Sequence, residues 1–359
     1  MKILHVITSL RTGGAEKLMV DLLPRLRDLG NDVELLVFDG IRTPFYEQLE
    51  TAGIKIHALS VGRNVYNPLN LIKLIPYLKR YDVVHTHNTA PQLFAAIGHR
   101  FCKGKLINTE HSTSNRRRKW FLFNYIDRWM YSRYDKVICI SAIAEKSVRE
   151  HIGGHPLNIC TINNGVDTQR FIHAEPCEEI CICYKKLKTA IMVAGFRWEK
   201  DHTTLIKAYT HLPDDYHLLL AGTGVLQKEV EELCKELHLE NRVHFLGMRS
   251  DIPQLLKSVD VVIMSSHFEG LSLSSIEGMA SGKPFIASDV DGLREVVNGA
   301  GILFPHEDDK KLAEEIEKLC TDSDYRECTI KKCQERAMHY DISAMAQNYH
   351  KLYNELNYV

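Results

Sequence analysis

The sequence has no long hydrophobic run and no marked excess of charge of either sign. No window approaches the ~18 apolar residues that span a bilayer, and segment 1–7 is too short and too soon interrupted for the hydrophobic part of a secretory signal. With 45 basic and 46 acidic residues, the chain exerts no long-range attraction on nucleic acid or anionic lipid. These absences predict a cytoplasmic protein that does not bind nucleic acid.

A standard zinc-binding pattern of cysteines is also missing. Most of the ten cysteines are scattered over predicted strands and helices, where buried reduced thiols are common. Cys177, Cys181 and Cys183 lie close together, but their spacing is not that of a zinc site and no clear fourth ligand accompanies them. We therefore interpret this segment as a cysteine-bearing loop and expect no metal there.

The length and composition are those of an ordinary globular protein. The chain has 359 residues, which at ~150 residues per domain predicts two domains, each large enough for its own core. Apolar residues make up 45% and charged residues 25% of the sequence, so no disordered or fibrous bias is present.

Two series of β-branched runs alternate with helical patterns. The first series predicts strands at Ile3–Ile7, Val33–Phe38, Lys55–Ala58, Val83–Thr86, Lys105–Thr109 and Val137–Ile140. Turn residues follow at 162–167, and a polar stretch continues to Lys188. The second series predicts strands at Ala190–Ala194, His217–Ala221, Val243–Leu246, Val261–Met264, Pro284–Ala287 and Ile302–Phe304.

This alternation is typical of α/β proteins whose parallel sheets are covered by helices on both faces. We predict two Rossmann-like, doubly wound domains at residues 1–165 and 166–342. A final helical pattern, about 343–359, is predicted to cross back to the first domain.

The sharpest motif spans residues 265–280, directly after the predicted strand Val261–Met264. Gly270 allows a tight turn, and Ser272 can cap a helix whose free N–H groups attract an anion such as a diphosphate. Glu269 precedes this helix, and Glu277 lies in its second turn with its side chain leaning back toward the start. Both carboxylates can therefore face one ligand, although a helix with two solvated glutamates is the alternative.

In these residues the chain resembles the family-four retaining glycosyltransferases of the GT-B fold, whose hallmark is two glutamates separated by seven residues in such a segment. The resemblance implies two domains facing across a cleft and transfer of a sugar from a nucleotide-diphosphate donor to an acceptor hydroxyl. It also implies that Glu269 contacts the donor sugar and that Glu277 holds the ribose. The amides of Gly270, Leu271 and Ser272 would receive the distal phosphate.

A pair of glycines, Gly13 and Gly14, opens the first predicted helix. The pair lacks the third glycine of a dinucleotide fingerprint, so hydride chemistry is weakly supported. In the family this loop lies beside the donor phosphates and the acceptor, which implies the same for Gly13 and Gly14; an ordinary strand-to-helix turn is the alternative.

Two cations follow the first strand of the second domain. Fixed positive charge near a departing diphosphate lowers the barrier where negative charge grows. Lys200 matches the phosphate-binding lysine of the family. The family's arginine lies five positions earlier, where this chain has Gly195, so Arg197 supplies the guanidinium or none is present; solvated surface is the alternative for both cations.

Four more side chains are assigned by the resemblance or by their position. His111, at a predicted strand end, matches a cleft histidine that contacts the donor sugar near its anomeric carbon. His85 and His87 also end a strand, and we interpret them as acceptor-side contacts or as core or rim residues. Arg249 lies in a loop that resembles the one cradling the nucleobase.

No catalytic metal is expected. Asp289 and Asp291 look like the metal-binding pair of another glycosyltransferase fold, but they fall in a turn where this family has a glycine-rich loop. Lysine, arginine and helix amides can neutralise the diphosphate instead. We expect no cofactor besides the nucleotide-sugar co-substrate.

A basic run is followed by an aromatic residue, in the order Arg116, Arg117, Arg118, Lys119 and Trp120. One interpretation is a docking strip that contacts anionic membrane or a lipid-linked acceptor. The alternative is a helix with one solvated basic face.

The sequence therefore predicts a retaining glycosyltransferase of cell-surface polysaccharide or glycolipid assembly, acting on a saccharide or lipid-linked acceptor. The predicted catalytic residues are Glu269, His111, Lys200 and Arg197. A non-catalytic nucleotide-sugar-binding subunit is the alternative, because Gly195 stands where an arginine is usual, and a dehydrogenase is a distant third. The base, sugar and acceptor are left open.

Overall fold

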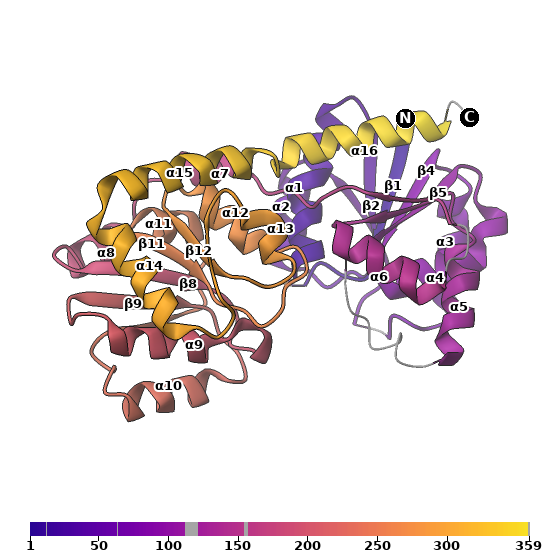
Figure 1. The fold of residues 1–359 in the computed structure, drawn as a ribbon. Coiled ribbons are helices and arrows are strands. Elements are labelled where there is room, and N and C mark those ends of the chain that lie inside the picture. The colour runs from indigo at the N-terminus through magenta and orange to yellow at the C-terminus, as the bar shows by residue number, and fades with distance from the viewer. Residues whose placement is uncertain (12, 63, 112–120, 154–156, 358–359) are drawn as a thin grey trace. The chain divides into compact units, whose positions relative to one another are not determined.

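The computed structural model describes residues 1–11, 13–62, 64–111, 121–153 and 157–357 (Figure 1). The chain forms two compact units, which are described separately. The first contains residues 1–165 and 342–359, and the second contains residues 166–341.

The first unit is built on a seven-stranded parallel sheet in the order β3-β2-β1-β4-β5-β6-β7. Its strands are β1 Lys2–Ile7, β2 Asp32–Asp39, β3 Lys55–Ser60, β4 Val83–His87, β5 Lys105–Glu110, β6 Lys136–Cys139 and β7 Ile159–Thr161. Its helices are α1 Gly14–Asp28, α2 Pro44–Thr51, α3 Leu69–Leu78, α4 Thr89–Gly98, α5 Phe121–Tyr131, α6 Ala142–Ile152 and α16 Ile342–Asn357, with a 3₁₀ turn at His99–Phe101.

Helices cover both faces of this sheet. Side chains alternate across a strand, so Ile3 and Ile7 of β1 enter one core, and Leu4 and Val6 enter the other. The first core contains residues of α1, α2 and α16, and the second contains residues of α3 to α6. Burial on both faces explains why the strands read as continuous apolar runs.

The second unit has a six-stranded parallel sheet in the order β10-β9-β8-β11-β12-β13. Its strands are β8 Lys188–Val193, β9 Tyr216–Ala221, β10 Val243–Gly247, β11 Val261–Met264, β12 Phe285–Ser288 and β13 Ile302–Phe304. Its helices are α7 Thr168–Ile172, α8 Glu178–Cys183, α9 His202–Ala208, α10 Gln227–Glu236, α11 Ile252–Lys257, α12 Leu273–Ala280, α13 Leu293–Val297, α14 Asp309–Thr321 and α15 Ser323–Met338.

The predicted fold class is confirmed, since each unit is a parallel sheet with helices on it. Every predicted strand is present, with ends that differ by one or two residues. The sequence analysis missed β7, which has only three residues and carries little periodicity.

The polar stretch between the two series is not a simple loop, and the cysteine-bearing loop expected there is wrong. Asp167 caps α7 by accepting a hydrogen bond from the Arg170 amide, and Phe171 is buried below it. Cys181 and Cys183 lie on α8, which is anchored by the buried Ile180. Helices of five and six residues, with two buried side chains in α7 and one in α8, carry too weak a pattern to be predicted from the sequence.

The last helix, α16, packs on α1 within the first unit. Its aromatic residues Tyr349 and Tyr353 are fully buried, with Met345 beside them in the same core. Among the described residues, no helix combines the length and apolar character that crossing a bilayer requires.

Candidate functional site

The predicted site residues lie where parallel strands end, which is the edge at which doubly wound sheets bind ligands. In the second unit, Lys200 follows β8, Glu269 follows β11, and Glu277 lies on α12. In the first unit, Gly13 and His111 follow β1 and β5.

The structure brings Lys200 and Glu269 into direct contact. The Lys200 ammonium forms an ion pair and a hydrogen bond with Oε1 of Glu269. The hydroxyl of Ser266 donates a second hydrogen bond to the same oxygen at 3.1 Å. The lysine and glutamate side chains are 23% and 12% exposed, so both charges remain within reach of a ligand.

The loop that carries Glu269 is fastened to its neighbours on both sides. The His267 amide donates to the Glu199 carbonyl at 2.9 Å, which joins this loop to the segment after β8. The hydroxyl of Ser288, at the end of β12, accepts from the Ser266 amide at 2.7 Å and donates to the Ser266 carbonyl at 2.8 Å. The position of Glu269 is therefore set by three strand ends together.

Gly292 allows this loop to pack against the turn after β12. Its φ of +83° lies in the left-handed region. A Cβ added there would lie 2.0 Å from the Gly270 carbonyl oxygen and 2.4 Å from that of Glu269, and backbone atoms cannot yield to such contacts cheaply.

We therefore expect Gly292→Ala to displace the Glu269 loop and to abolish nucleotide-sugar binding, as measured by calorimetry. Gly299→Ala is the matched control, because Gly299 has a similar φ of +78° but only a distant arginine nitrogen within 4.0 Å of an added Cβ. Both variants share the left-handed backbone cost of about 1–2 kcal/mol, so equal donor affinity in the two would refute a special role for Gly292.

Helix α12 begins beside this loop, and the main-chain amides of its first turn have no partners within the helix. Ser272 is its N-cap, accepting a hydrogen bond from the Ser275 amide, which confirms the predicted cap. Leu271 is buried, whereas Gly270 and Glu277 are half-buried. The helix start thus offers partial positive charge next to the Lys200–Glu269 pair.

The two predicted arginines, Arg197 and Arg249, make other contacts than Lys200 does. Arg197 is exposed and borders an open hollow of about 530 Å³, which is lined by residues 197–199 and 223–226 and not by Lys200 or Glu269. Arg249 pairs with Asp251 at 2.7 Å and with Glu179 at 3.4 Å. The contact with Asp251 most of all, and then that with Glu179, raises the pKa of the Arg249 guanidinium. Donor contacts by both arginines stay predictions.

In the first unit, the α1 start is covered by a carboxylate of its own helix. Gly13 is the N-cap, with an extended backbone, and Gly14 is the first helical residue. A Cβ on Gly13 would lie 2.2 Å from the carboxylate oxygen of Glu16. Burial raises the pKa of the Glu16 carboxyl group. The Glu16 carboxylate therefore lies at the helix start where the sequence predicts a phosphate, and the donor contacts of Gly13 and Gly14 stay a prediction.

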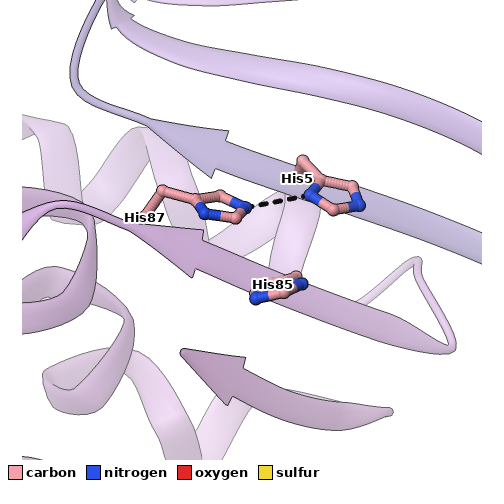
Figure 2. Close-up of side chains that lie close together, drawn as sticks. All are labelled: His5, His85 and His87. Carbon is pink, nitrogen blue, oxygen red and sulfur yellow. Dashed lines mark hydrogen bonds between the residues drawn. The ribbon is translucent and has the colours of Figure 1, made fainter. Parts of the chain in front are cut away.

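His111 is one end of a chain of hydrogen-bonded imidazoles. Its Nε2 lies 2.9 Å from Nδ1 of His87, and Nε2 of His87 lies 3.0 Å from Nδ1 of His5 on the neighbouring strand (Figure 2). The hydroxyl of Tyr353 lies 3.5 Å from Nε2 of His5 and 2.6 Å from Nδ1 of His85. These hydrogen-bonded side chains connect the strands β5, β4 and β1 and the helix α16.

The four imidazoles of this group, those of His5, His85, His87 and His111, are neutral at pH 7. Burial lowers the pKa of His5 to about 3 and that of His111 to about 4, and it lowers those of His85 and His87 well below 6.5. A neutral imidazole has one N–H donor and one bare nitrogen, so each nitrogen pair shares a single proton. The tautomer of His111 is therefore coupled to those of His87 and His5.

This arrangement places His85 and His87 in the core, so of the two interpretations offered by the sequence, the core role is correct. The sequence analysis missed His5, because nothing in the sequence pairs it with a residue 82 positions away. Nitrogens of His5, His85 and His87 lie within 4.8 Å of one another, as metal ligands do. However, both nitrogens of His85 are already bonded, to Tyr353 and to Thr109 at 2.7 Å, which favours hydrogen bonding over metal ligation.

The basic run at residues 116–120 lies outside the described residues.

Two family models match most of the chain. The family model described as "Glycosyltransferase Family 4" matches residues 12–170, and "Glycosyl transferases group 1" matches residues 182–336. The N,N'-diacetylbacillosaminyl-diphospho-undecaprenol alpha-1,3-N-acetylgalactosaminyltransferase of Campylobacter jejuni is 26% identical over 93% of this chain and 94% of its own. The Escherichia coli UDP-Gal:alpha-D-GlcNAc-diphosphoundecaprenol alpha-1,3-galactosyltransferase is 23% identical over 81% of this chain and 80% of its own.

Solved structures show the same fold. HepE of Anabaena, crystallised with UDP-glucose, superposes with a TM-score of 0.83 at 23% identity, covering 99% of this chain and 100% of its own. The sucrose-phosphate synthase of Thermosynechococcus elongatus superposes with a TM-score of 0.78 at 20% identity, covering 99% of both chains.

Proposed function

The chain belongs to the group 1, family-four glycosyltransferases of the GT-B fold, and we propose that it transfers a sugar from a UDP-linked donor to a saccharide acceptor with retention of anomeric configuration. The observation that carries the proposal is the Lys200–Glu269 pair, held at the ends of β8 and β11 beside the N-terminus of α12. The uridine base is inferred from HepE, which was crystallised with UDP-glucose, and from the UDP-Gal named for the Escherichia coli relative.

Each group of the pair has a distinct task in this proposal. The Lys200 ammonium and the amides of Gly270, Leu271 and Ser272 stabilise the negative charge that grows on the distal phosphate as the bond to the sugar breaks. Glu269 accepts hydrogen bonds from sugar hydroxyls, and Glu277 accepts them from the ribose. Because the two members of the ion pair touch, one sugar phosphate can contact both.

The reaction is proposed to run on one face of the sugar. The bond between C1 and the phosphate oxygen breaks, the acceptor oxygen bonds to C1 from the same side, and its proton passes to the departing phosphate. No enzyme nucleophile and no metal ion are needed for this step. His111 is assigned, by resemblance to the family, to contact the sugar near C1.

The acceptor is proposed to be a lipid-linked saccharide. Both named bacterial relatives act on diphospho-undecaprenol substrates by their descriptions. Such an acceptor places the reaction at the inner face of the cytoplasmic membrane, and contact through residues 116–120 belongs to the same proposal.

Donor binding tests this function directly. UDP-sugars at about 100 times their dissociation constant are expected to add ~2.7 kcal/mol to the free energy of unfolding, which a thermal-shift assay detects. Transfer to a lipid-linked acceptor should then release UDP, and NMR of the product gives its anomeric configuration. Binding without any transfer would instead indicate a non-catalytic subunit, and stabilisation by NAD but by no nucleotide sugar would indicate a dehydrogenase.

A further inference from the structure

A second group of polar side chains lies at the strand ends of the second unit, next to the Lys200–Glu269 pair in sequence but not part of it. His267 follows β11, His306 and Glu307 follow β13, and Asp201 follows the turn after β8. His267 lies within the motif at 265–280, but none of these four residues has a role in the transferase assignment. Ligand atoms of Asp201, His267 and His306 lie within 4.8 Å of one another.

Three atoms of this group form a triangle of the size that a bound metal ion requires. Nδ1 of His267 lies 2.8 Å from Nε2 of His306 and 3.4 Å from Oε1 of Glu307, and that oxygen lies 3.9 Å from Nε2 of His306. The circle through these three atoms has a radius of about 2.0 Å, which is the length of a Zn–N or Zn–O bond. An ion at the centre of this circle lies in the plane of the three atoms, so tetrahedral binding requires a small rearrangement, above all a separation of the two imidazole nitrogens.

The other nitrogen of His267 faces a buried carboxylate. Its Nε2 lies 3.6 Å from Oδ1 of Asp201, whose side chain is 2% exposed. A carboxylate at this place favours the tautomer with the proton on Nε2, which leaves a bare Nδ1 directed at His306 and Glu307. Histidines that bind metals are commonly oriented by a carboxylate in this way.

Asp201 also has an oxygen that the protein leaves without a partner. Its Oδ1 accepts from the Thr204 amide at 3.1 Å, whereas Oδ2 is buried and has no hydrogen-bond partner. A buried carboxylate with an unused oxygen is destabilised unless positive charge lies close by. A cation held by His267 and its neighbours would supply that charge.

The backbone at both ends of the group is strained. Among the described residues, four that are not glycine have a positive φ, and two of these are Asp201 at +38° and Glu307 at +63°. Such conformations are retained where the surrounding structure or a ligand requires them.

We propose that His267, His306 and Glu307 bind a divalent transition-metal ion of the zinc class, with Asp201 as the carboxylate that orients His267. Two neutral imidazoles and one carboxylate form a donor set typical of zinc sites that keep a fourth position open to water. The Glu307 and His306 side chains are 61% and 39% exposed, which gives the ion access from solvent. With Asp201 included, two negative charges balance the two positive charges of the ion.

The ion would join the turn after β13 to the loop that carries Glu269, because His267 lies two residues before that glutamate. The site belongs to the second unit alone and does not depend on the transfer chemistry proposed above. It differs from the aspartate pair at Asp289 and Asp291, whose carboxylates are engaged by Arg294.

The test is zinc binding by the full chain, with any affinity tag removed and with reduced cysteines. Calorimetry is expected to show one zinc ion per chain, with the proton between His267 and His306 moving to Nδ1 of His306, because a neutral imidazole keeps one N–H when its other nitrogen binds a metal. His306→Ala should remove saturable binding and Glu307→Gln should weaken it. Asp201→Asn keeps a capping side chain and should weaken binding about 10- to 100-fold, as for other carboxylates that orient a ligand.

The matched control is His211→Ala. His211 pairs with Asp309 at 3.3 Å on the same unit, but among the described residues no third metal-binding side chain lies beside them. Zinc binding should therefore not change. Cobalt substitution should give visible bands without the near-ultraviolet band that a thiolate ligand adds. The proposal is overturned if the wild-type chain binds no zinc at micromolar concentration, if His306→Ala binds as tightly as wild type, or if His87→Asn abolishes binding, since the ion would then lie among the buried histidines.

Discussion

Replacing Lys200 with alanine is expected to lower kcat by about 100- to 1,000-fold, the range found when one preorganised donor to a developing negative charge is removed. The ammonium contacts Glu269 and is only 23% exposed, so solvent cannot take over its role easily. The effect belongs to the transition state, and KM for the donor should change much less than kcat. Steady-state release of UDP measures both constants.

The double variant with Glu269→Gln separates catalysis from folding. Removing Lys200 alone leaves a partly buried carboxylate without its partner, and that loss of stability should be relieved when Glu269 is also neutralised. Activity should not recover in the double variant, because the phosphate still lacks its cation. Lys207→Ala, on the exposed side of α9, is the control that should keep full activity. Recovery of turnover in the double variant would mean that the pair is only structural.

Acidification from pH 7.5 to about 5 is expected to unfold the first unit. His5, His85 and His87 are buried and His111 is half-buried, and burial lowers the pKa values of all four from 6.5, so all four are neutral at pH 7.5. Below pH 6.5 the unfolded chain binds protons at these four residues and the native chain does not, so the free energy of unfolding falls as pH falls. The stability that the four neutral histidines contribute is fully present above pH 6.5, which is the pKa of histidine in the unfolded chain.

The size of this effect follows from the number of protons. Each histidine contributes ~1.4 kcal/mol per pH unit once the pH lies well below 6.5 and above its folded pKa, so four contribute up to about 5.5 kcal/mol per unit. A domain has only about 5–15 kcal/mol of stability in total. Urea unfolding at a series of pH values, followed by a probe in the first unit, measures the slope.

A single substitution isolates one member of the set. His87→Asn keeps an amide that can bond to His111 but removes one titrating group, so the slope below pH 6 should fall by ~1.4 kcal/mol per unit. The exposed His339→Gln on the second unit should leave the slope unchanged. Equal urea midpoints for the wild-type chain at pH 5 and 7.5 would contradict neutral, buried histidines.

Much of the molecule could be predicted from local patterns. The strands of both units were found because a parallel sheet buried on both faces demands continuous apolar runs, as in Val261–Met264. The cap at Ser272 was found because capping is decided by a residue and its next three neighbours. The roles of Glu269 and Lys200 came from resemblance to the family, and the structure adds that the two side chains touch.

The contacts that the sequence analysis could not specify are those between distant segments. Lys200 and Glu269 meet across 69 residues, His267 and His306 across 39, and His85 and Tyr353 across 268. Nothing local distinguishes these three histidines from the other 15 of the 18 in the chain, because a histidine suits a core, a surface or a metal site equally well.

The sequence by itself determined the two parallel-sheet units and the strand ends at which a ligand binds, because hydrophobic periodicity and turn chemistry act over a few residues. The tertiary structure decided which side chains meet at those ends. It placed His111 at the end of a buried imidazole chain and set Asp201 behind His267. Contacts of this kind depend on strand order and register, which bring together residues that are remote along the chain.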